Sequence, residues 1–370
     1  MSAMSSPSDP APEPRQLPRE LPFEHLDLPA LGGHIGPEPE DFKVDEVPLY
    51  EASGQGDHWY VRLEKRERTT RDLCIAVAAA SGAPEREIGY AGLKDKHAVT
   101  TQWLSVPAQR TAPPEAWSLG EGFRLLEVKR HGNKLRVGHL DANRFQIRLV
   151  DLDPAVAERV GPLCERVAKS GIGNAFGPQR FGLGQRNLDS ALYALRRGRL
   201  NPRAGHRAKF MASVIQSEVF NRYLIARLAE ARDRVVVGDV MRLEGSRSLF
   251  VVEDVAREQS RLDAGDIHLT GPMIGPKMKE AQGWPLELEL AAAESLGLDA
   301  AALKALAPSA PGTRRDLLLR PTELLHEPAQ QGWMVAFTLP AGAYASLVVR
   351  CLTRQEPWLS SDRGLDAAAD

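Results

Sequence analysis

The pattern of hydrophobic and polar residues switches several times along the chain between a period of two and a period of about 3.6 residues. The segment "DHWYVRLEK" alternates Trp59, Val61 and Leu63 with polar neighbours, which is typical of a half-buried strand. The following segment, "TTRDLCIAVAAASG", predicts a helix that begins at a threonine cap and ends at Gly82. Strands and helices are therefore both expected.

The same mixture continues to the end of the chain. Three strands are expected within residues 123–150, and the last of them has alternating hydrophobic and basic faces. Helical periodicity returns over residues 153–170 and 210–231. Near the end, "WMVAFTL" predicts a strand, "PAGAY" a turn and "ASLVVRCL" a helix. No repeat of fixed period is visible.

Composition narrows the class of protein. The chain has 370 residues, of which 43% are hydrophobic and 26% charged, as in a globular protein with two or three domains. It has no run of eighteen apolar residues and no signal-like start, so we expect a cytoplasmic protein without a membrane segment. Cys74, Cys164 and Cys351 are far apart, which suits a reducing compartment and predicts small buried hydrophobes.

Charge is distributed unevenly, although the net charge is only −2. Residues 1–40 carry nine prolines and seven acids against two arginines, and at least the first twenty residues are expected to be disordered. Residues 124–148 contain seven Lys or Arg and two acids, and "RRGRLNPRAGHRAK" (196–209) contains six Lys or Arg and no acid. The second stretch suits a phosphate backbone, whereas the mixed segment "VRLEKRERTTR" is interpreted as a solvated face.

Common cofactor and metal motifs fail on spacing. "GIGNAFG" has Phe176 where a dinucleotide-binding loop requires its third glycine, and "GPMIGPK" lacks the spacing and the hydroxyl of a P-loop. The sequence has no HExxH, no CxxC pair and no GxSxG elbow. We therefore expect no cofactor and no metal site.

Four unusual strings remain, and they lie far apart in the sequence. They are "PEDFKVDE" (39–46), "GYAGLKDKHAVTTQ" (89–102), "GIGNAFGPQRFG" (171–182) and "LPAGAYASLVVR" (339–350). Together they resemble the TruD family of pseudouridine synthases, which isomerise uridine 13 of transfer RNA. The match runs in order across nearly the whole chain after residue 35.

The resemblance implies an α+β fold. It predicts a pseudouridine synthase catalytic domain with a mixed, largely antiparallel sheet, interrupted by an inserted α/β domain, with the RNA in a cleft between domains. A monomer is expected. The expected division is a Pro-rich disordered tail (1–34), the first catalytic part (35–199), the insert (200–318), the last catalytic part (319–358) and a C-terminal tail (359–370).

The expected reaction breaks the bond from C1′ to N1 of uridine and rejoins the base through C5, without redox change. A carboxylate can serve as the nucleophile on the ribose or as the base that removes the C2′ proton, and Asp95 fits both roles. Lys94, Lys96 and His97 are predicted to lower the pKa of Asp95, or to bind phosphate. On local composition alone, a solvated turn is the alternative.

The target base must leave its stack, which requires flat apolar side chains and a few polar groups. The resemblance implies that Phe42 and Tyr344 line the pocket, that Phe176 stands where other pseudouridine synthases use Tyr, and that Asn174 contacts the nucleotide. Gly36 occupies the position six residues before Phe42 where the family often has a basic residue, so the cation that pairs with Asp95 is left open.

Transfer RNA is the expected partner, and its backbone is expected to contact Arg196, Arg197, Arg199 and Arg203. Two alternatives stay open. One is a pseudouridine synthase of this family that acts on another RNA, and the other is a non-catalytic RNA-binding protein with the same fold.

Overall fold

The computed structural model describes residues 22, 24–109, 111–200 and 205–356, with the side chain of Leu183 left out. The described residues fall into two compact units. We call residues 24–183 and 318–356 the sheet unit, and residues 184–200 and 205–317 the insert unit. The insert unit thus interrupts the sheet unit in sequence, as expected of an inserted domain.

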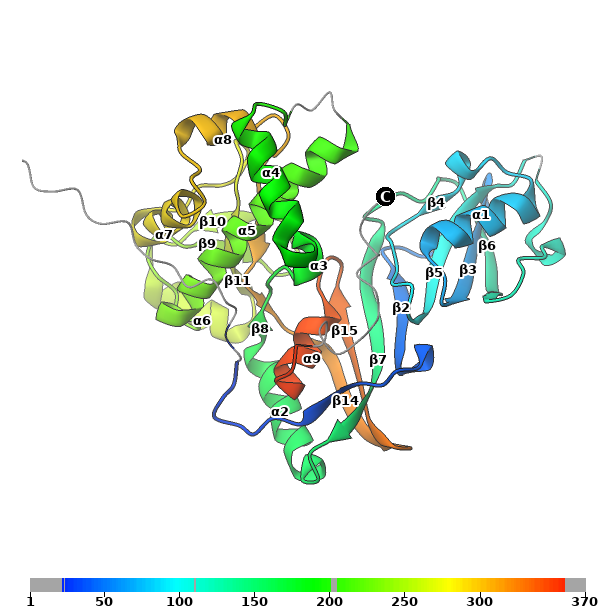
Figure 1. Cartoon of the computed structure of the whole chain (residues 1–370), viewed down its shortest axis with the longest axis horizontal. Coiled ribbons are helices and arrows are strands. Elements are labelled where there is room, and N and C mark those ends of the chain that lie inside the picture. Colours follow the sequence, from blue (N-terminus) through cyan, green and yellow to red (C-terminus); the bar gives the residue numbers. More distant parts are fainter. Residues whose placement is uncertain (1–21, 23, 110, 201–204, 357–370) are drawn as a thin grey trace, which may run out of the picture. The chain divides into compact units, whose positions relative to one another are not determined.

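The sheet unit is built on a nine-stranded sheet (Figure 1). Its central path runs in the order β14 (Thr322–Ala329), β15 (Gly332–Pro340), β7 (Leu140–Leu152), β2 (Phe42–Pro48), β5 (Val99–Pro107), β3 (His58–Arg66) and β6 (Phe123–His131). The short strands β1 (Gly32–Ile35) and β4 (Gly89–Tyr90) pair with β7 and β5. Strands β2 and β5 are parallel and the other pairs are antiparallel. This arrangement confirms the predicted α+β class.

Helix α1 (Thr70–Ser81) lies against β3 and β5 (Figure 1). Thr69 and Asp72 form a capping box at its start, and Gly82 ends it with a φ of 78°, a conformation that glycine adopts without strain. Leu73 packs with Val61 and other apolar residues of the strands. The predicted strand and helix are confirmed, although β3 also buries Tyr60 on its second face and is therefore more than half-buried.

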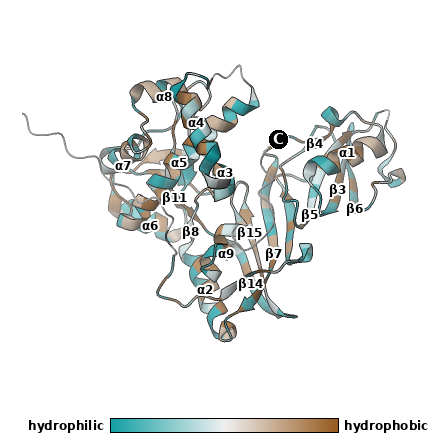
Figure 2. Cartoon of the chain, in the orientation of Figure 1, coloured by the Kyte–Doolittle hydropathy of each residue, from teal (hydrophilic) through white to brown (hydrophobic). Residues whose placement is uncertain are grey.

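The other half of the sheet is covered by α2 (Val156–Ser170), which packs on β14, and by α9 (Ala345–Thr353), which packs on α2 and β1. A two-stranded sheet joins β8 (Ile172–Gly173) to β13 (Leu318–Leu319), and α3 (Pro178–Phe181) follows β8. The predicted strand, turn and helix near the end are confirmed as β15 and α9. Hydrophobic and hydrophilic residues alternate along β7 (Figure 2), and buried and half-buried positions alternate along β15.

The insert unit has a four-stranded sheet in the order β10 (Leu249–Val251), β9 (Val240–Leu243), β11 (Ile267–Met273) and β12 (Thr313–Asp316). Its helices are α4 (Arg186–Arg196), α5 (His206–Ala231), α6 (Val255–Ala264), α7 (Gly283–Glu294) and α8 (Ala300–Leu306). Helix α5 packs closely on β11, because a Cβ at Gly271 would lie 2.9 Å from the Phe220 ring and 3.0 Å from the Tyr223 ring.

Three expectations about boundaries are wrong. Residues 123–150 form two strands rather than three, because residues 132–139 are a connection without strand pairing. The predicted disordered tail ends before residue 34, since β1 pairs with β7 and Asp27 bonds Arg166. The insert unit begins at residue 184 rather than 200, because α4 packs on α5. The first twenty residues lie outside the described residues.

Short 3-10 turns occur at Pro39–Asp41, Glu85–Glu87, Pro114–Ala116 and Leu183–Gln185.

Cys74, Cys164 and Cys351 are each less than 5% exposed, as predicted. Burial raises the pKa of the Cys74 and Cys164 thiols to about 12, so both behave as packing residues. Within the described part of the chain, no helix has the length and apolar character needed to span a bilayer.

Candidate active site

Asp95 lies on the connection between β4 and β5, residues 91–98. The residue is exposed, and so is its neighbour Leu93 at 65%. The connection is held at several points: the Lys94 amide donates to Thr70 Oγ1 at 3.0 Å, and the Gly138 amide donates to the Ala91 carbonyl at 2.8 Å. Asp95 is therefore an exposed residue on a backbone with fixed anchors.

The side chain of Lys94 is one of these anchors. Its Nζ lies 3.0 Å from Glu46 Oε2, and the two side chains are only 5% and 1% exposed. The same ammonium donates to Asn143 Oδ1. Lys94 therefore ties the Asp95 connection to β2 and β7, and its charge is already neutralised by a buried carboxylate. Of the other predicted bases, Lys96 is exposed and His97 is half-buried.

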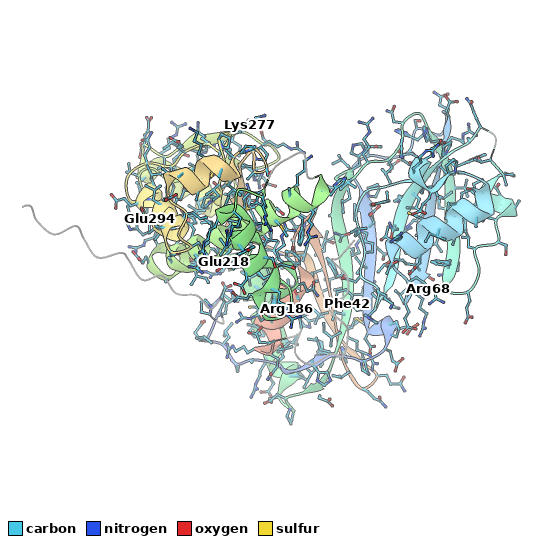
Figure 3. All side chains as sticks on the ribbon, turned by 45° about the horizontal axis from the view of Figure 1, so that its top comes forward. Phe42, Arg68, Arg186, Glu218, Lys277 and Glu294 are labelled. Carbon is cyan, nitrogen blue, oxygen red and sulfur yellow. The ribbon has the colours of Figure 1, made fainter. Side chains whose placement is uncertain are left out.

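A second buried lysine reaches Asp95 from a distant part of the sequence. Lys65, at the end of β3, is 0% exposed, and its Nζ donates at 2.6 Å to the Asp95 carbonyl. It donates at 2.6 Å to the carbonyl of Arg68 as well, which lies between β3 and α1 (Figure 3). The interpretation of "VRLEKRERTTR" as a solvated face is wrong for Lys65. The missed signal is the period of two, which places Lys65 on the same face as Val61 and Leu63.

The electrostatic balance at Asp95 differs from the prediction. The protein atoms crowded around the carboxyl raise its pKa above the ordinary 3.8, although the residue keeps more than a third of its surface accessible. The positive charges of Lys65 and Lys94 oppose that rise and favour the charged form. The expected net lowering by neighbouring cations is thus wrong, because desolvation outweighs their charges.

Phe42 is the first residue of β2 and is half-buried (Figure 3). The centroids of its ring and the Phe145 ring are 6.1 Å apart, in an edge-to-face arrangement. Because side chains alternate along a strand, Phe42, Val44 and Glu46 share one face of β2. Lys94 bonds Glu46, so the Asp95 connection lies over the face that carries Phe42.

Phe176 and Tyr344 come together although 168 positions separate them in the sequence. Their ring centroids are 6.3 Å apart in an edge-to-face arrangement. The Arg180 guanidinium lies 5.8 Å from the Phe176 ring centroid, and burial lowers the pKa of Arg180. Asn174, two residues before Phe176, is 7% exposed. The structure thus pairs two of the predicted aromatic residues, and their approach to Asp95 stays a prediction.

The sheet unit also contains a cavity of about 250 Å³ that Asp95 and the predicted aromatic residues do not line. From β2, Asp45, Glu46, Val47 and Pro48 line it. Its cations are paired with acids, as in Arg62 with Asp45. Other lining residues are Tyr50, Tyr60, Trp103, Lys129 and Arg144. We place the candidate chemistry at Asp95, not in this cavity.

The two basic stretches differ in how their charges are used. In residues 124–148, several bases have acidic partners; the pairs are Arg124 with Glu64, Lys129 with Glu127, Arg144 with Glu323 and Arg148 with Asp41. In the insert unit, by contrast, Arg196, Arg197 and Arg199 are exposed, and the Arg197 guanidinium lies 5.6 Å from the ring centroid of the exposed Tyr193. Arg203 lies outside the described residues.

No group of three His, Cys, Asp or Glu side chains within the ranges described is arranged to hold a metal ion. The candidate residues are the exposed Asp95, the two buried lysines that contact its connection, and the half-buried aromatic residues whose approach to Asp95 is predicted.

Comparison with known proteins identifies the family. A family model described as tRNA pseudouridine synthase D (TruD) matches residues 24–198 and 208–352. The tRNA pseudouridine synthase D of Anaeromyxobacter dehalogenans strain 2CP-C is 43% identical over 350 residues, which cover 93% of this chain and 99% of that protein. The one from Thermus thermophilus is 38% identical over 342 residues, covering 92% and 94%. A crystal structure of a TruD protein from Methanosarcina mazei has a TM-score of 0.69 at 23% identity, covers 90% of this chain and 96% of that chain, and has the same fold. The four motifs therefore identify the family correctly, and the chain belongs to the TruD family of tRNA pseudouridine synthases.

Proposed function

We propose that this protein isomerises uridine 13 of transfer RNA to pseudouridine and that Asp95 is its catalytic residue. The observation that carries the proposal is the presentation of Asp95: an exposed carboxylate on a connection whose backbone and neighbouring side chain are held by buried groups. A solvated turn residue needs no such support, whereas a nucleophile or a base must be held in place to act on a bound ribose.

The chemistry requires the ionised carboxylate in either route. As a nucleophile, Asp95 attacks C1′ and releases the uracil; as a base, it removes the C2′ proton. The nearby charges of Lys65 and Lys94 favour the ionised form. Phe42, Phe176 and Tyr344 hold the flipped uracil, and Asn174 contacts the nucleotide, since each belongs to a motif that matches the family. The isomerisation involves no redox change, so no cofactor takes part.

The RNA backbone contacts the exposed Arg196, Arg197 and Arg199 of the insert unit, with Lys96 and His97 near the reacting nucleotide. These bases supply affinity rather than sequence recognition, because phosphates are alike at every position. The protein acts on transfer RNA as a monomer.

The test is to incubate the purified protein with total transfer RNA and to map pseudouridine at each position. Formation at position 13 supports the proposal. Formation only at another position or in another RNA favours the first alternative, and RNA binding without pseudouridine favours a non-catalytic RNA-binding protein.

The variant Asp95→Asn tests the role of the carboxylate. Turnover should fall by several orders of magnitude, while the melting curve and the dissociation constant for RNA stay close to wild type, since binding draws on many other contacts. More than about a tenth of wild-type turnover, a loss below roughly 1.4 kcal/mol of barrier, would return Asp95 to the solvated-turn interpretation.

A further inference from the structure

Lys65 is a buried cation placed directly beneath the backbone of Asp95. It follows Leu63 on the face of β3 that α1 covers, and it is 0% exposed. Two of its three N–H groups donate to carbonyl oxygens, one of Asp95 and one of Arg68, each at 2.6 Å. A fully buried ammonium group is costly to desolvate, so its presence in a core-facing position calls for an explanation.

The charge of Lys65 is balanced differently from that of Lys94. Lys94 contacts the buried carboxylate of Glu46. No carboxylate lies within 4 Å of Lys65 Nζ in the described ranges, and the acids that act on its charge are first Asp95 and then Asp72 of α1. Lys94 repels it. The negative group that most stabilises the Lys65 charge is thus the proposed catalytic carboxylate.

Residue 36, the position at which the family resemblance leads one to expect a cation, has no room for a longer side chain in this chain. A Cβ at Gly36 would lie 2.1 Å from Asp41 Oδ2. Asp41 cannot easily move, because Oδ1 accepts from Arg148 Nε at 2.6 Å and Oδ2 accepts from the Glu38 amide at 3.0 Å. A lysine or arginine at residue 36 therefore does not fit, and the cation for Asp95 must come from elsewhere.

A separate buried polar pair, Thr70 and Gln102, holds the connection at the residue before Asp95. Thr70 Oγ1 accepts from the Lys94 amide and donates to Gln102 Oε1, both at 3.0 Å. Thr100, which pairs with Lys65 across β3 and β5, is 0% exposed, as is Gln102. The residue before Asp95 is thus fixed by Thr70, and Asp95 itself by Lys65.

We propose that Lys65 is the positioning residue of this active site: its ammonium group fixes the Asp95 backbone and supplies the positive charge that Gly36 cannot. This inference rests on the proposed catalytic role of Asp95. Lys65 is buried, and it acts only through Asp95.

If the charge of Lys65 supports catalysis, turnover depends on pH in a way that a purely structural role of Lys65 would not produce. Burial lowers the pKa of Lys65 to about 8, against the opposing attraction of Asp95. Between that value and 10.5 the unfolded chain binds more protons at this group than the folded chain, so this lysine's contribution to stability rises with pH. Turnover should do the opposite, because the charge opposite Asp95 disappears as pH rises through about 8.

The experiment measures single-turnover pseudouridine formation from pH 6 to 9.5 in wild type and in Lys65→Met, together with RNA affinity and melting curves at each pH. Wild-type turnover should decline as pH rises through about 8, while the melting temperature shows no parallel decline. Lys65→Met should be slower by about 10- to 100-fold, the effect of one charge-assisted hydrogen bond, and its basic decline should be absent. RNA affinity should stay unchanged. Lys129→Met, which removes a half-buried lysine paired with Glu127, should keep the wild-type rate and profile.

Each outcome decides between the proposals. Wild-type turnover in Lys65→Met, or a slow variant that keeps the wild-type basic decline, overturns the role of Lys65. If Lys65→Met does not fold, the wild-type profile decides alone, and a plateau between pH 7 and 9.5 overturns the inference. Asp95→Asn separates the two proposals: an active Asp95→Asn refutes the catalytic aspartate, whereas an inactive Asp95→Asn with an unaffected Lys65→Met refutes only the positioning lysine.

Discussion

The ion pair between Glu46 and Lys94 offers a test of how strongly the sheet holds the Asp95 connection. Glu46→Gln keeps the shape of the side chain and leaves an oxygen to accept from the Trp103 amide, which donates to Glu46 at 3.1 Å. It removes the negative charge opposite Lys94, whose side chain is only 5% exposed. An uncompensated buried charge costs about 3–5 kcal/mol. For a unit of this size, that lowers the melting temperature by about 6–20 °C.

The assay is a double-variant cycle followed by denaturant and thermal unfolding. Glu46→Gln should show the full loss in the free energy of unfolding. Adding Lys94→Met removes the stranded ammonium, so the double variant should regain much of that loss, with an interaction energy of at least about 2 kcal/mol between the two positions. Glu323→Gln is the control, because Glu323 pairs with Arg144 at the surface and both side chains are more than half exposed. It should change stability by less than about 1 kcal/mol.

A small effect of Glu46→Gln, comparable with that of Glu323→Gln, would refute the reasoning. So would additive losses in the double variant, since independent residues show no interaction energy. Either result would mean that Lys94 finds solvent or another acceptor when Glu46 is neutral, and that the Asp95 connection does not depend on this pair.

Three other predictions concern RNA, metals and acid. Replacing Arg196, Arg197 and Arg199 by Glu should weaken transfer RNA binding and reduce the slope of log K against log salt by roughly 0.7–0.9 for each lost phosphate contact; unchanged affinity and slope would make these arginines a solvated face. Turnover should survive EDTA without any added small molecule, and a loss that zinc restores would contradict this. Because desolvation raises the pKa of Asp95, turnover should fall on acidification with an apparent pKa above 3.8 in a pH–rate profile; a decline only at or below 3.8 would show that the carboxyl is not desolvated.

Local sequence patterns predict helices and strands well where interactions between residues close in the sequence decide the structure. The helix from Thr70 to Ser81 has a capping box and a glycine stop within a few residues of its ends, so its bounds are contained in the sequence itself. The first residue of the insert unit, by contrast, cannot be predicted from the local sequence. Helix α4 has an amphipathic face whose partner is α5, and only the packing of these two helices assigns α4 to the insert.

The motifs locate Asp95, but the periodicity is needed to find what supports it. Lys65 and Glu46 both stand at positions of a strand that alternation assigns to the buried face, after Leu63 and Val44. A charged residue in such a position interrupts the hydrophobic pattern. Its charge alone predicts a solvated side chain, whereas its place in the alternation predicts a buried one. Their partners, the Asp95 carbonyl and Lys94, lie 30 and 48 residues away, so sequence spacing alone cannot pair them.

The bases around Asp95 therefore have separate roles that their shared charge conceals. Lys94 is adjacent to Asp95 in the sequence, yet its ammonium group pairs with Glu46 and anchors the connection. Lys96 is exposed and can meet a phosphate. Lys65 is thirty residues away, yet its charge acts on Asp95 more strongly than that of Lys94. Both ammonium groups are buried, but that of Lys94 contacts the carboxylate of Glu46, whereas no carboxylate lies within 4 Å of Lys65 Nζ in the described residues. The cation that matters most to the carboxylate is thus the one that the fold, rather than the motif, places beside it.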